Sequence, residues 1–244
     1  MEDQRFVIIT PAYNCADKII RTAMSVIGQT YQNWHWVVCD DMSTDNTSQV
    51  ILDVCKSNLV SNKLTLINRR EKYGEVRNTL EETEKLNPED IVVRLDAGDF
   101  ITDLGCLEIL NNLYKNYDPA VLWTAHRWSF TNKNISGPID MNINVYHQPW
   151  RSSHLKTYRV KDFLGINKKN YLDKEGDYIM IACDQAIFLP MMERARRANR
   201  PLAFYDSVMY HYDINLEDPE LFTKDRSIDQ KCSAEWIRNR GYVE

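Results

Sequence analysis

Three groups of polar residues follow hydrophobic stretches in the first half of the chain. They are Thr10–Asn14, the pair Asp40-Asp41, and Asp96–Asp99. If the hydrophobic stretches are strands of one parallel sheet, the groups meet at its carboxyl edge, where such sheets bind ligands. Four carboxylates at one edge are suited to a divalent cation, which would balance the charge of a bound phosphate.

Each group also has a structural interpretation. Asp40 and Asp41 precede a predicted helix and are suited to capping it, Asp96–Asp99 has the composition of an ordinary turn, and Tyr13 fits a half-buried aromatic residue. Neither the Gly-x-Gly-x-x-Gly pattern nor the P-loop pattern occurs in the sequence. Their absence argues against a dinucleotide-binding enzyme and against an ATPase.

The elements that would position these groups alternate along the first half. Short β-branched or aromatic runs predict strands at residues 6–10, 34–39, 64–67, 91–95 and 121–125. Hydrophobic residues at helical spacing predict helices at 19–27, 47–56, 76–86 and 104–114. Strands joined through helices predict βαβ units, and therefore an α/β fold around a mostly parallel sheet.

The second half is less regular. Residues 132–157 are polar and include Trp150 and His154, which predicts a long segment without regular structure, of the kind that carries function. A helix is expected from about 182 to 199, one or two strands within 202–210, and a polar helix at 217–240. We therefore expect a single domain, 1–244, with a C-terminal helical extension.

The composition is typical of a globular protein and excludes several partners. The chain has 244 residues, with 30 Lys and Arg against 35 Asp and Glu, so its net charge is −5. No overall basic field attracts nucleic acid or an anionic membrane. The six cysteines are scattered, and the sequence shows neither a signal peptide nor a transmembrane run, which predicts a cytoplasmic protein.

Several segments together resemble the family 2 glycosyltransferases. The order and spacing of these segments carry the resemblance, since each is weak alone. They are Val7–Asn14, Ser25–Tyr31, Val37–Asp45, Gly74–Asn78, Leu95–Asp99 and Cys183–Ala186. The family has the GT-A fold, a mostly parallel, Rossmann-like sheet flanked by helices. The resemblance implies a nucleotide-binding half at 1–130, an acceptor and catalytic half at 131–215, and a C-terminal helix at 216–244.

The resemblance implies a donor site for a nucleoside-diphosphate sugar, with a UDP-sugar favoured. Tyr13 is expected against the base, Asp41 as an acceptor for a hydrogen bond from the base, and Arg77 near the base or the diphosphate. The irregular segment is expected to roof the donor sugar, with His154 in it. The full expected set is Thr10, Pro11, Ala12, Tyr13, Asn14, Asp41, Gly74, Arg77, Asp96, Ala97 and His154.

The expected metal site departs from the family pattern. The family motif is Asp-x-Asp-Asp, and its third position, which normally ligates the metal, is Gly98 in this chain. Asp99 is the candidate to turn inward as the ligand, with Asp96 and His211 completing a site for Mn²⁺ or Mg²⁺. The alternative is that metal dependence is weakened or lost.

Asp184 is the candidate catalytic base. The family inverts the anomeric carbon by a single displacement, in which a carboxylate takes the proton of the acceptor hydroxyl. Without the resemblance, Asp184 would be interpreted as a helix N-cap, and the two roles are compatible. Asp173, Glu175 and Asp177 are competing carboxylates that have the pattern of an exposed acidic loop.

The acceptor is expected to be a glycan, whether free, lipid-linked or protein-linked. A modified DNA base is disfavoured by the net negative charge. Two other function classes remain open at this point. One is a non-catalytic relative that binds nucleotide or glycan, which Gly98 encourages, and the other is a nucleotidyltransferase, which also uses strand-end carboxylates and a metal.

Overall fold

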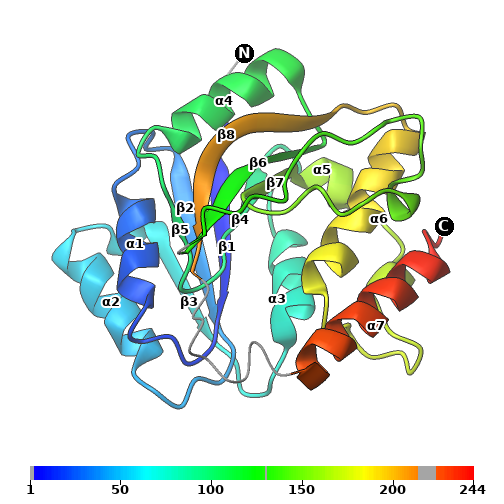
Figure 1. Cartoon of the computed structure of the whole chain (residues 1–244). Helices are drawn as coiled ribbons and strands as arrows, with labels where there is room; N and C mark the ends of the chain where they lie inside the picture. Colours follow the sequence, from blue (N-terminus) through cyan, green and yellow to red (C-terminus); the bar gives the residue numbers. More distant parts are fainter. Residues whose placement is uncertain (1–2, 130, 214–223) are drawn as a thin grey trace.

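A computed structural model of the chain describes residues 3–129, 131–213 and 224–244, with the side chains described from residue 228 in the last range. One eight-stranded sheet runs through the middle of the described part (Figure 1), in the order β3-β2-β1-β4-β7-β6-β8-β5. The strands are β1 Phe6–Ala12, β2 Trp34–Asp40, β3 Leu64–Asn68, β4 Ile91–Arg94, β5 Phe100–Ile101, β6 Val121–Trp128, β7 Lys156–Arg159 and β8 Leu202–Tyr212.

The sheet is mostly parallel, as the sequence predicts. Strands β1 to β4 pair in parallel, and β6 pairs in parallel with β8. The antiparallel strand β7 joins the two parts, because it pairs with β4 on one side and β6 on the other. The carboxyl ends of β1, β2, β4, β6 and β8 therefore meet at one edge, the lower edge in Figure 1.

Helices cover both faces of the sheet and form two hydrophobic layers. The long helices are α1 Ile19–Ile27, α2 Thr47–Ser57, α3 Gly74–Thr83, α4 Cys106–Tyr117, α6 Cys183–Arg197 and α7 Lys224–Arg240, and the short ones are α5 Val160–Phe163 and the 3₁₀ turns η1 Ser61–Lys63, η2 Val145–His147 and η3 Lys168–Tyr171. Phe6 and Ile8 pack with α1, α2 and α4, whereas Val7 and Ile9 pack with α3 and α6. Alternate residues of β1 thus enter opposite layers, and all four are fully buried.

Strand β7 begins at Lys156, inside the segment expected to be irregular up to residue 157, and it corrects the end of that segment. Its sequence, Lys156–Arg159, lacks hydrophobic alternation, yet all four residues are buried in the centre of the sheet. Their polar groups have specific partners: the Tyr158 hydroxyl lies 2.6 Å from that of Thr83, and Arg159 pairs with Asp118 at 2.8 Å. Hydrogen bonds and ion pairs make this polar strand tolerable inside the sheet.

The C-terminal helix α7 packs against α6. The expected span, 217–240, begins outside the described residues, and the described helix ends at Arg240 as predicted. Arg238 donates hydrogen bonds to the side chain of Gln185 at 2.7 Å and to the carbonyl groups of Tyr146 and Gln148 at 2.9 and 2.7 Å. This one side chain therefore joins α7 to the start of α6 and to η2.

Within the described ranges, no helix has both the length and the hydrophobicity needed to span a membrane.

We predict that Arg238→Ala loosens α7, because three carbonyl acceptors lose a charged donor at once. The expected loss in the free energy of unfolding is about 2 kcal/mol, measured by urea denaturation. Hydrogen exchange should speed up in α7 and at the start of α6. The exposed residue of the same helix, Lys231, supplies the control, since Lys231→Ala should change neither quantity. Equal stability of the two variants would contradict this role for Arg238.

Candidate functional site

Three cavities follow one another at the carboxyl edge of the sheet. Their volumes are about 350, 230 and 160 Å³. We call them the Tyr13 cavity, the central cavity and the Trp150 cavity. The first two share Glu75, Asp96 and Met180, and the last two share His154 and Asp184 among others. The shared walls make one groove.

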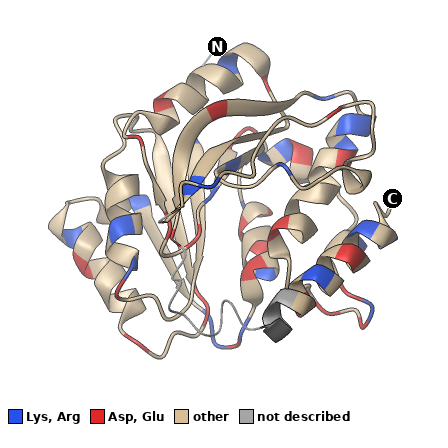
Figure 2. Ribbon diagram, viewed as in Figure 1, with Lys and Arg blue, Asp and Glu red and all other residues tan. Residues whose placement is uncertain are grey.

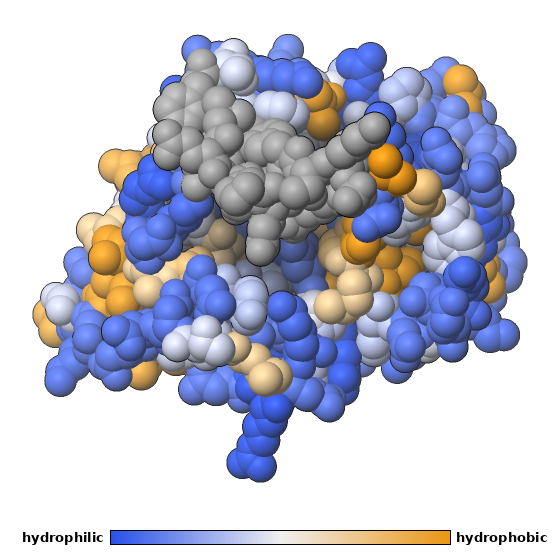
Figure 3. All heavy atoms as spheres, turned by 60° about the horizontal axis from the view of Figure 1, so that its bottom comes forward, coloured by the Kyte–Doolittle hydropathy of each residue, from blue (hydrophilic) through white to orange (hydrophobic). Residues whose placement is uncertain are grey.

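The surface around the groove is polar. Acidic residues lie along α3 and near the lower ends of the strands, as Figure 2 shows. Figure 3 looks onto this end of the molecule, where hydrophilic residues predominate and hydrophobic ones form separate spots.

The Tyr13 cavity gathers most of the expected donor residues. Its lining consists of Pro11, Ala12, Tyr13, Asp41, Lys72, Gly74, Glu75, Asp96, Ala97 and Met180. The Tyr13 ring is about half exposed, and the Lys72 ammonium lies 3.5 Å from its centre. Lys72 was not predicted, because an isolated lysine in a loop carries no pattern. Among the described residues that line this cavity, Lys72 is the one with a positive charge.

Asp41 ties the end of β2 to the start of α3. One carboxylate oxygen accepts from the Tyr73 backbone at 2.7 Å and from the Asn78 side chain at 3.0 Å, and the other accepts from the Gly74 backbone at 2.9 Å. Gly74 has φ +71°, and a Cβ at this position would collide with Met180. Asp41 thus shapes the cavity wall, and its carboxylate oxygens keep further acceptor capacity.

Three expected donor residues do not line the groove. Thr10 is fully buried, and its hydroxyl accepts a hydrogen bond from the Trp36 indole at 3.0 Å. Asn14 accepts from the Thr44 backbone at 2.8 Å and so connects two loops.

Arg77 is the third of these residues. It lies on α3, where its guanidinium pairs with Glu81 at 2.8 Å and with Glu71 at 3.1 Å. The sequence pattern placed it correctly on the helix but gave no information on where its side chain points.

Asp96 stands where the Tyr13 cavity meets the central cavity. The buried guanidinium of Arg94 pairs with Asp96 and with Glu75, the latter at 3.1 Å. Loss of solvation in the cleft, followed by the negative charge of Asp96, raises the pKa of Glu75 to about 7. Arg94 and Glu75 were not predicted, since the contact between them joins β4 to α3, 19 residues apart in the sequence.

The structure does not bring the expected metal ligands together. Asp99 turns inward, but its carboxylate accepts from the Tyr210 hydroxyl at 2.6 Å and the Asp213 backbone at 2.8 Å. Burial raises the pKa of Asp99 well above its usual range, and Asp96 adds to the shift. Asp99 is absent from the lining of the three cavities.

His211 is likewise occupied away from the groove. Its ring nitrogens contact Arg127 at 3.2 Å and Ser129 at 3.0 Å, and its ring stacks on Phe100. Within the ranges that the structure describes, no three His, Cys, Asp or Glu side chains form a group able to hold a metal. Of the three expected ligands, Asp96 alone faces the groove.

Asp184 lines both the central cavity and the Trp150 cavity. Helix α6 begins at Cys183 after Ala182, whose left-handed backbone ends the preceding loop, so Asp184 lies in the first turn and is not the N-cap residue. Its carboxylate pairs with the fully buried ammonium of Lys156. Loss of solvation acts to raise the pKa of Asp184. The charge and hydrogen bond of Lys156, together with the charges of His154 and Arg94, outweigh it and hold the pKa well below its usual range.

His154 lies between the two carboxylates of the central cavity. Its Nδ1 is 3.8 Å from Asp96 and its Nε2 is 3.7 Å from Asp184. The ring stacks on Tyr210 with 4.6 Å between centroids. Burial, followed by the charge of Lys156, lowers the pKa of His154 to about 4, so the imidazole is neutral at pH 7.

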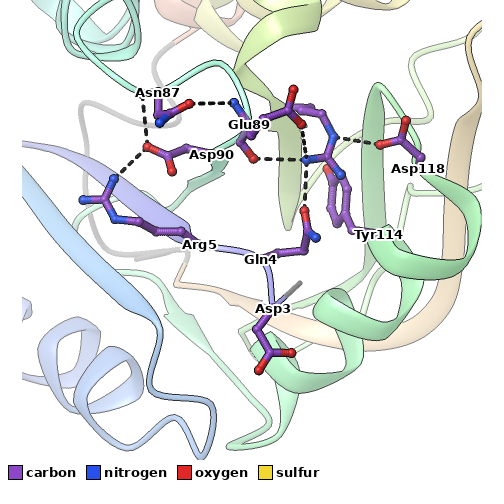
Figure 4. Close-up of a pocket in the computed structure, with 9 residues that line it drawn as sticks. Asp3, Gln4, Arg5, Asn87, Glu89, Asp90, Tyr114 and Asp118 are labelled. Atoms are coloured by element: carbon purple, nitrogen blue, oxygen red, sulfur yellow. Dashed lines mark hydrogen bonds and ion pairs between the residues drawn. The ribbon is translucent and has the colours of Figure 1, made fainter. Parts of the chain in front are cut away.

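A larger cavity of about 420 Å³ lies at the opposite edge of the sheet (Figure 4). Its charged side chains pair with one another: Arg5 with Asp90 at 2.7 Å, and Arg159 with Asp118 at 2.8 Å. These pairs fix the start of β4 and the end of β7. None of the predicted site residues is among the residues that line this cavity.

Comparison with known proteins identifies the family of this chain. A family profile described as "Glycosyl transferase family 2" matches residues 7–178. A UDP-Glc:α-D-GlcNAc-diphosphoundecaprenol β-1,3-glucosyltransferase, WfgD of Escherichia coli, is 42% identical over 59 residues, which are 24% of this chain and 23% of that protein. Chondroitin synthase of Pasteurella multocida (strain Pm70) is 22% identical over 97% of this chain, which spans 24% of that protein. The chain therefore matches about a quarter of the length of these curated relatives.

Solved structures confirm the predicted GT-A fold. TarS 1-349 of S. aureus, in complex with UDP, aligns with a TM-score of 0.66 and 18% identity, covering 99% of this chain and 67% of that chain. The mannosyltransferase PcManGT of Pyrobaculum calidifontis, in complex with GDP-Man and Mn²⁺, aligns with a TM-score of 0.63 and 16% identity, covering 96% and 63%. Because the family profile covers more than half of the sequence, the chain belongs to glycosyl transferase family 2.

Proposed function

We propose that this chain transfers a sugar from a nucleoside-diphosphate sugar to an acceptor hydroxyl, with inversion of the anomeric carbon. The observation that carries the proposal is the continuous groove from Tyr13 to Asp184, since it has an aromatic end for a base and an ionised carboxylate further along. Family membership supports the reaction class.

The nucleotide belongs in the Tyr13 cavity. An aromatic ring that is half exposed offers a base a flat hydrophobic surface, and Asp41 offers acceptor oxygens beside it. The Lys72 ammonium, which lies over Tyr13, supplies positive charge for the diphosphate. A UDP-sugar is the favoured donor, because TarS was solved with UDP and WfgD is named for UDP-Glc.

A divalent cation is compatible with one protein ligand, Asp96. Asp96 Oδ2 faces the groove 3.8 Å from His154 Nδ1, which is too far for a hydrogen bond and leaves the oxygen available. Mg²⁺ is commonly bound by one or two carboxylates together with substrate phosphates and water. Mn²⁺ or Mg²⁺ at Asp96 would neutralise charge on the departing diphosphate. Asp99 and His211 are not part of this proposal.

Asp184 is the proposed general base. As the acceptor oxygen forms its bond to the anomeric carbon, its proton passes to the Asp184 carboxylate. The bond between that carbon and the diphosphate oxygen breaks, and the electron pair leaves with the nucleoside diphosphate. Lys156 keeps the carboxylate ionised and holds one of its oxygens, so it positions the base without contacting the substrate.

The acceptor class and the cytoplasmic location stay predictions. The glycan acceptor is in keeping with WfgD, which is named for a lipid-linked sugar, and with chondroitin synthase. No feature of the described residues favours the nucleotidyltransferase alternative, whereas the incomplete metal motif keeps the non-catalytic relative as the competing hypothesis.

We predict that Asp184→Asn lowers the rate of sugar transfer at least roughly a hundredfold, because the general base is lost. Binding of UDP, measured by calorimetry, should change less than about twofold. Asp177→Asn, which alters an exposed competing carboxylate, is the matched control and should retain full activity. Normal turnover by Asp184→Asn would exclude Asp184 as the base.

We predict that Lys156→Met moves the acid limb of the kcat/KM profile to higher pH. The base works deprotonated, and without the neighbouring ammonium its pKa rises, so activity is lost earlier as the pH falls. Lys156→Arg should restore the profile in large part, and the exposed Lys169→Met should leave it unchanged. An acid limb that does not move in a folded Lys156→Met variant would contradict this role.

We predict that UDP with Mn²⁺ raises the melting temperature and that EDTA removes most of the rise, since ligands bound only by the folded state stabilise it. Asp96→Asn should lose the Mn²⁺-dependent part and keep the rest. A shift that survives EDTA in full would mean that the chain holds the diphosphate without a metal. No shift with any nucleotide diphosphate would favour the non-catalytic relative.

A further inference from the structure

The Trp150 cavity lies beyond Asp184 and has a composition of its own. Its volume is about 160 Å³, and its walls include two tryptophans, a tyrosine and an isoleucine. The polar side chains in the lining come from α6, from α7 and from the segment before β7. The described lining is Trp128, Ile135, Trp150, Ser153, His154, Ala182, Asp184, Gln185, Tyr212 and Gln230.

The two tryptophans are held by contacts outside the cavity. Trp150 packs on the hydrophobic layer of α6, and the buried Lys156 ammonium lies 5.6 Å from the centre of its ring. The Trp128 indole donates to His126 Nε2 at 3.0 Å, and its ring lies 6.0 Å from that of Tyr212. The cavity therefore has fixed aromatic walls, which carbohydrate rings can contact through their C–H faces.

The charge of the cavity selects against anionic ligands. Among its described lining residues there is no lysine or arginine, and Asp184 is the one ionised group at pH 7, since His154 is neutral there. Lys156 is fully buried and paired with Asp184, and the exposed Lys133 lies over Trp128, 4.4 Å from the ring centre, outside the lining. A carboxylate or phosphate inside the cavity would find no free counter-charge in the described lining and would lie close to the Asp184 carboxylate.

The remaining polar groups suit hydroxyls. Gln185 and Gln230 carry amides that both donate and accept, and Ser153 adds a hydroxyl. Arg238 donates to the Gln185 side-chain oxygen at 2.7 Å, which fixes the orientation of that amide. A neutral sugar, with hydroxyls at its rim and C–H groups on its faces, matches both the polar groups and the rings.

We propose that the Trp150 cavity is the acceptor subsite and that it takes an uncharged terminal pyranose, stacked on Trp150 with its reacting hydroxyl toward Asp184. The proposal rests on the proposed transferase function and adds the class of acceptor. The proposed subsite would accept acceptors that end in a neutral hexose or N-acetylhexosamine. It would reject acceptors that end in a uronic acid, because that sugar carries a carboxylate.

The test is saturation-transfer NMR on the full chain with UDP bound, using methyl β-glucoside, the methyl β-glycoside of N-acetylglucosamine, and methyl β-glucuronide as probes. We expect at least one neutral glycoside to bind about tenfold more tightly than the glucuronide. Trp150→Ala should weaken that binding about tenfold, as expected for a lost stacking surface, while UDP affinity stays unchanged. Trp150→Phe should retain most of the binding, and Tyr117→Ala, at an exposed aromatic on α4, is the control.

The outcomes separate the two proposals. Tighter binding of the glucuronide, especially if Lys133→Ala abolishes it, would overturn the neutral acceptor subsite, as would neutral binding that Trp150→Ala leaves intact. Failure of every glycoside to bind while UDP binds would also overturn it. Failure of UDP to bind, with the Trp150-dependent glycoside signal still present, would contradict the transferase proposal and leave Trp150 in a binding site for neutral sugars that is not an acceptor subsite.

Discussion

The contact between the Lys156 ammonium and the Asp184 carboxylate joins the two parts of the molecule that make the site. Lys156 belongs to β7, the antiparallel strand in the middle of the sheet, and Asp184 belongs to the first turn of α6. A fully buried ammonium is costly unless a negative charge stands next to it. The fold therefore requires a carboxylate at this point of the groove, and the same carboxylate is suited to take a proton from an acceptor.

The rest of the groove follows from the topology of the sheet. The parallel strands β1, β2 and β4 bring Tyr13, Asp41 and Asp96 to one edge, which is the end proposed for the donor. Strand β7 connects these strands to β6 and β8, and the ends of β6 and β8 supply Trp128 and Tyr212. Helix α7 closes the far side, since Arg238 fixes Gln185. The walls proposed for donor and acceptor thus come from different parts of the chain and meet at Asp184.

The sequence predicted the parallel half well because hydrophobic runs and helical spacing are local signals. Tyr13, Asp41 and Asp96 were found by their places after strands, and Asp184 by the resemblance to the family. The structure brings all four to one groove. Strand β7 was missed because its polar side chains are satisfied by residues far along the chain, such as Thr83 and Asp118.

The directions of the side chains could not be predicted from the sequence either. A motif locates Asp99, His211 and Arg77 on the chain, but it does not say that Asp99 turns to Tyr210, that His211 stacks on Phe100 or that Arg77 pairs with Glu81. Lys72 and Lys156 belong to no motif, and their importance comes from the rings and charges that the fold places beside them.

The central claim is that sugar transfer is a single displacement in this groove, with Asp184 as the one general base. The anomeric configuration of the product tests this claim most directly. In the absence of acceptor, water takes the place of the acceptor hydroxyl, so slow hydrolysis of UDP-glucose, whose sugar is α-linked, can be followed by proton NMR. The account predicts that the first glucose to appear is the β-anomer, before mutarotation mixes the two forms. Initial release of the α-anomer would contradict it, because displacement by water from the face opposite the diphosphate inverts the anomeric carbon.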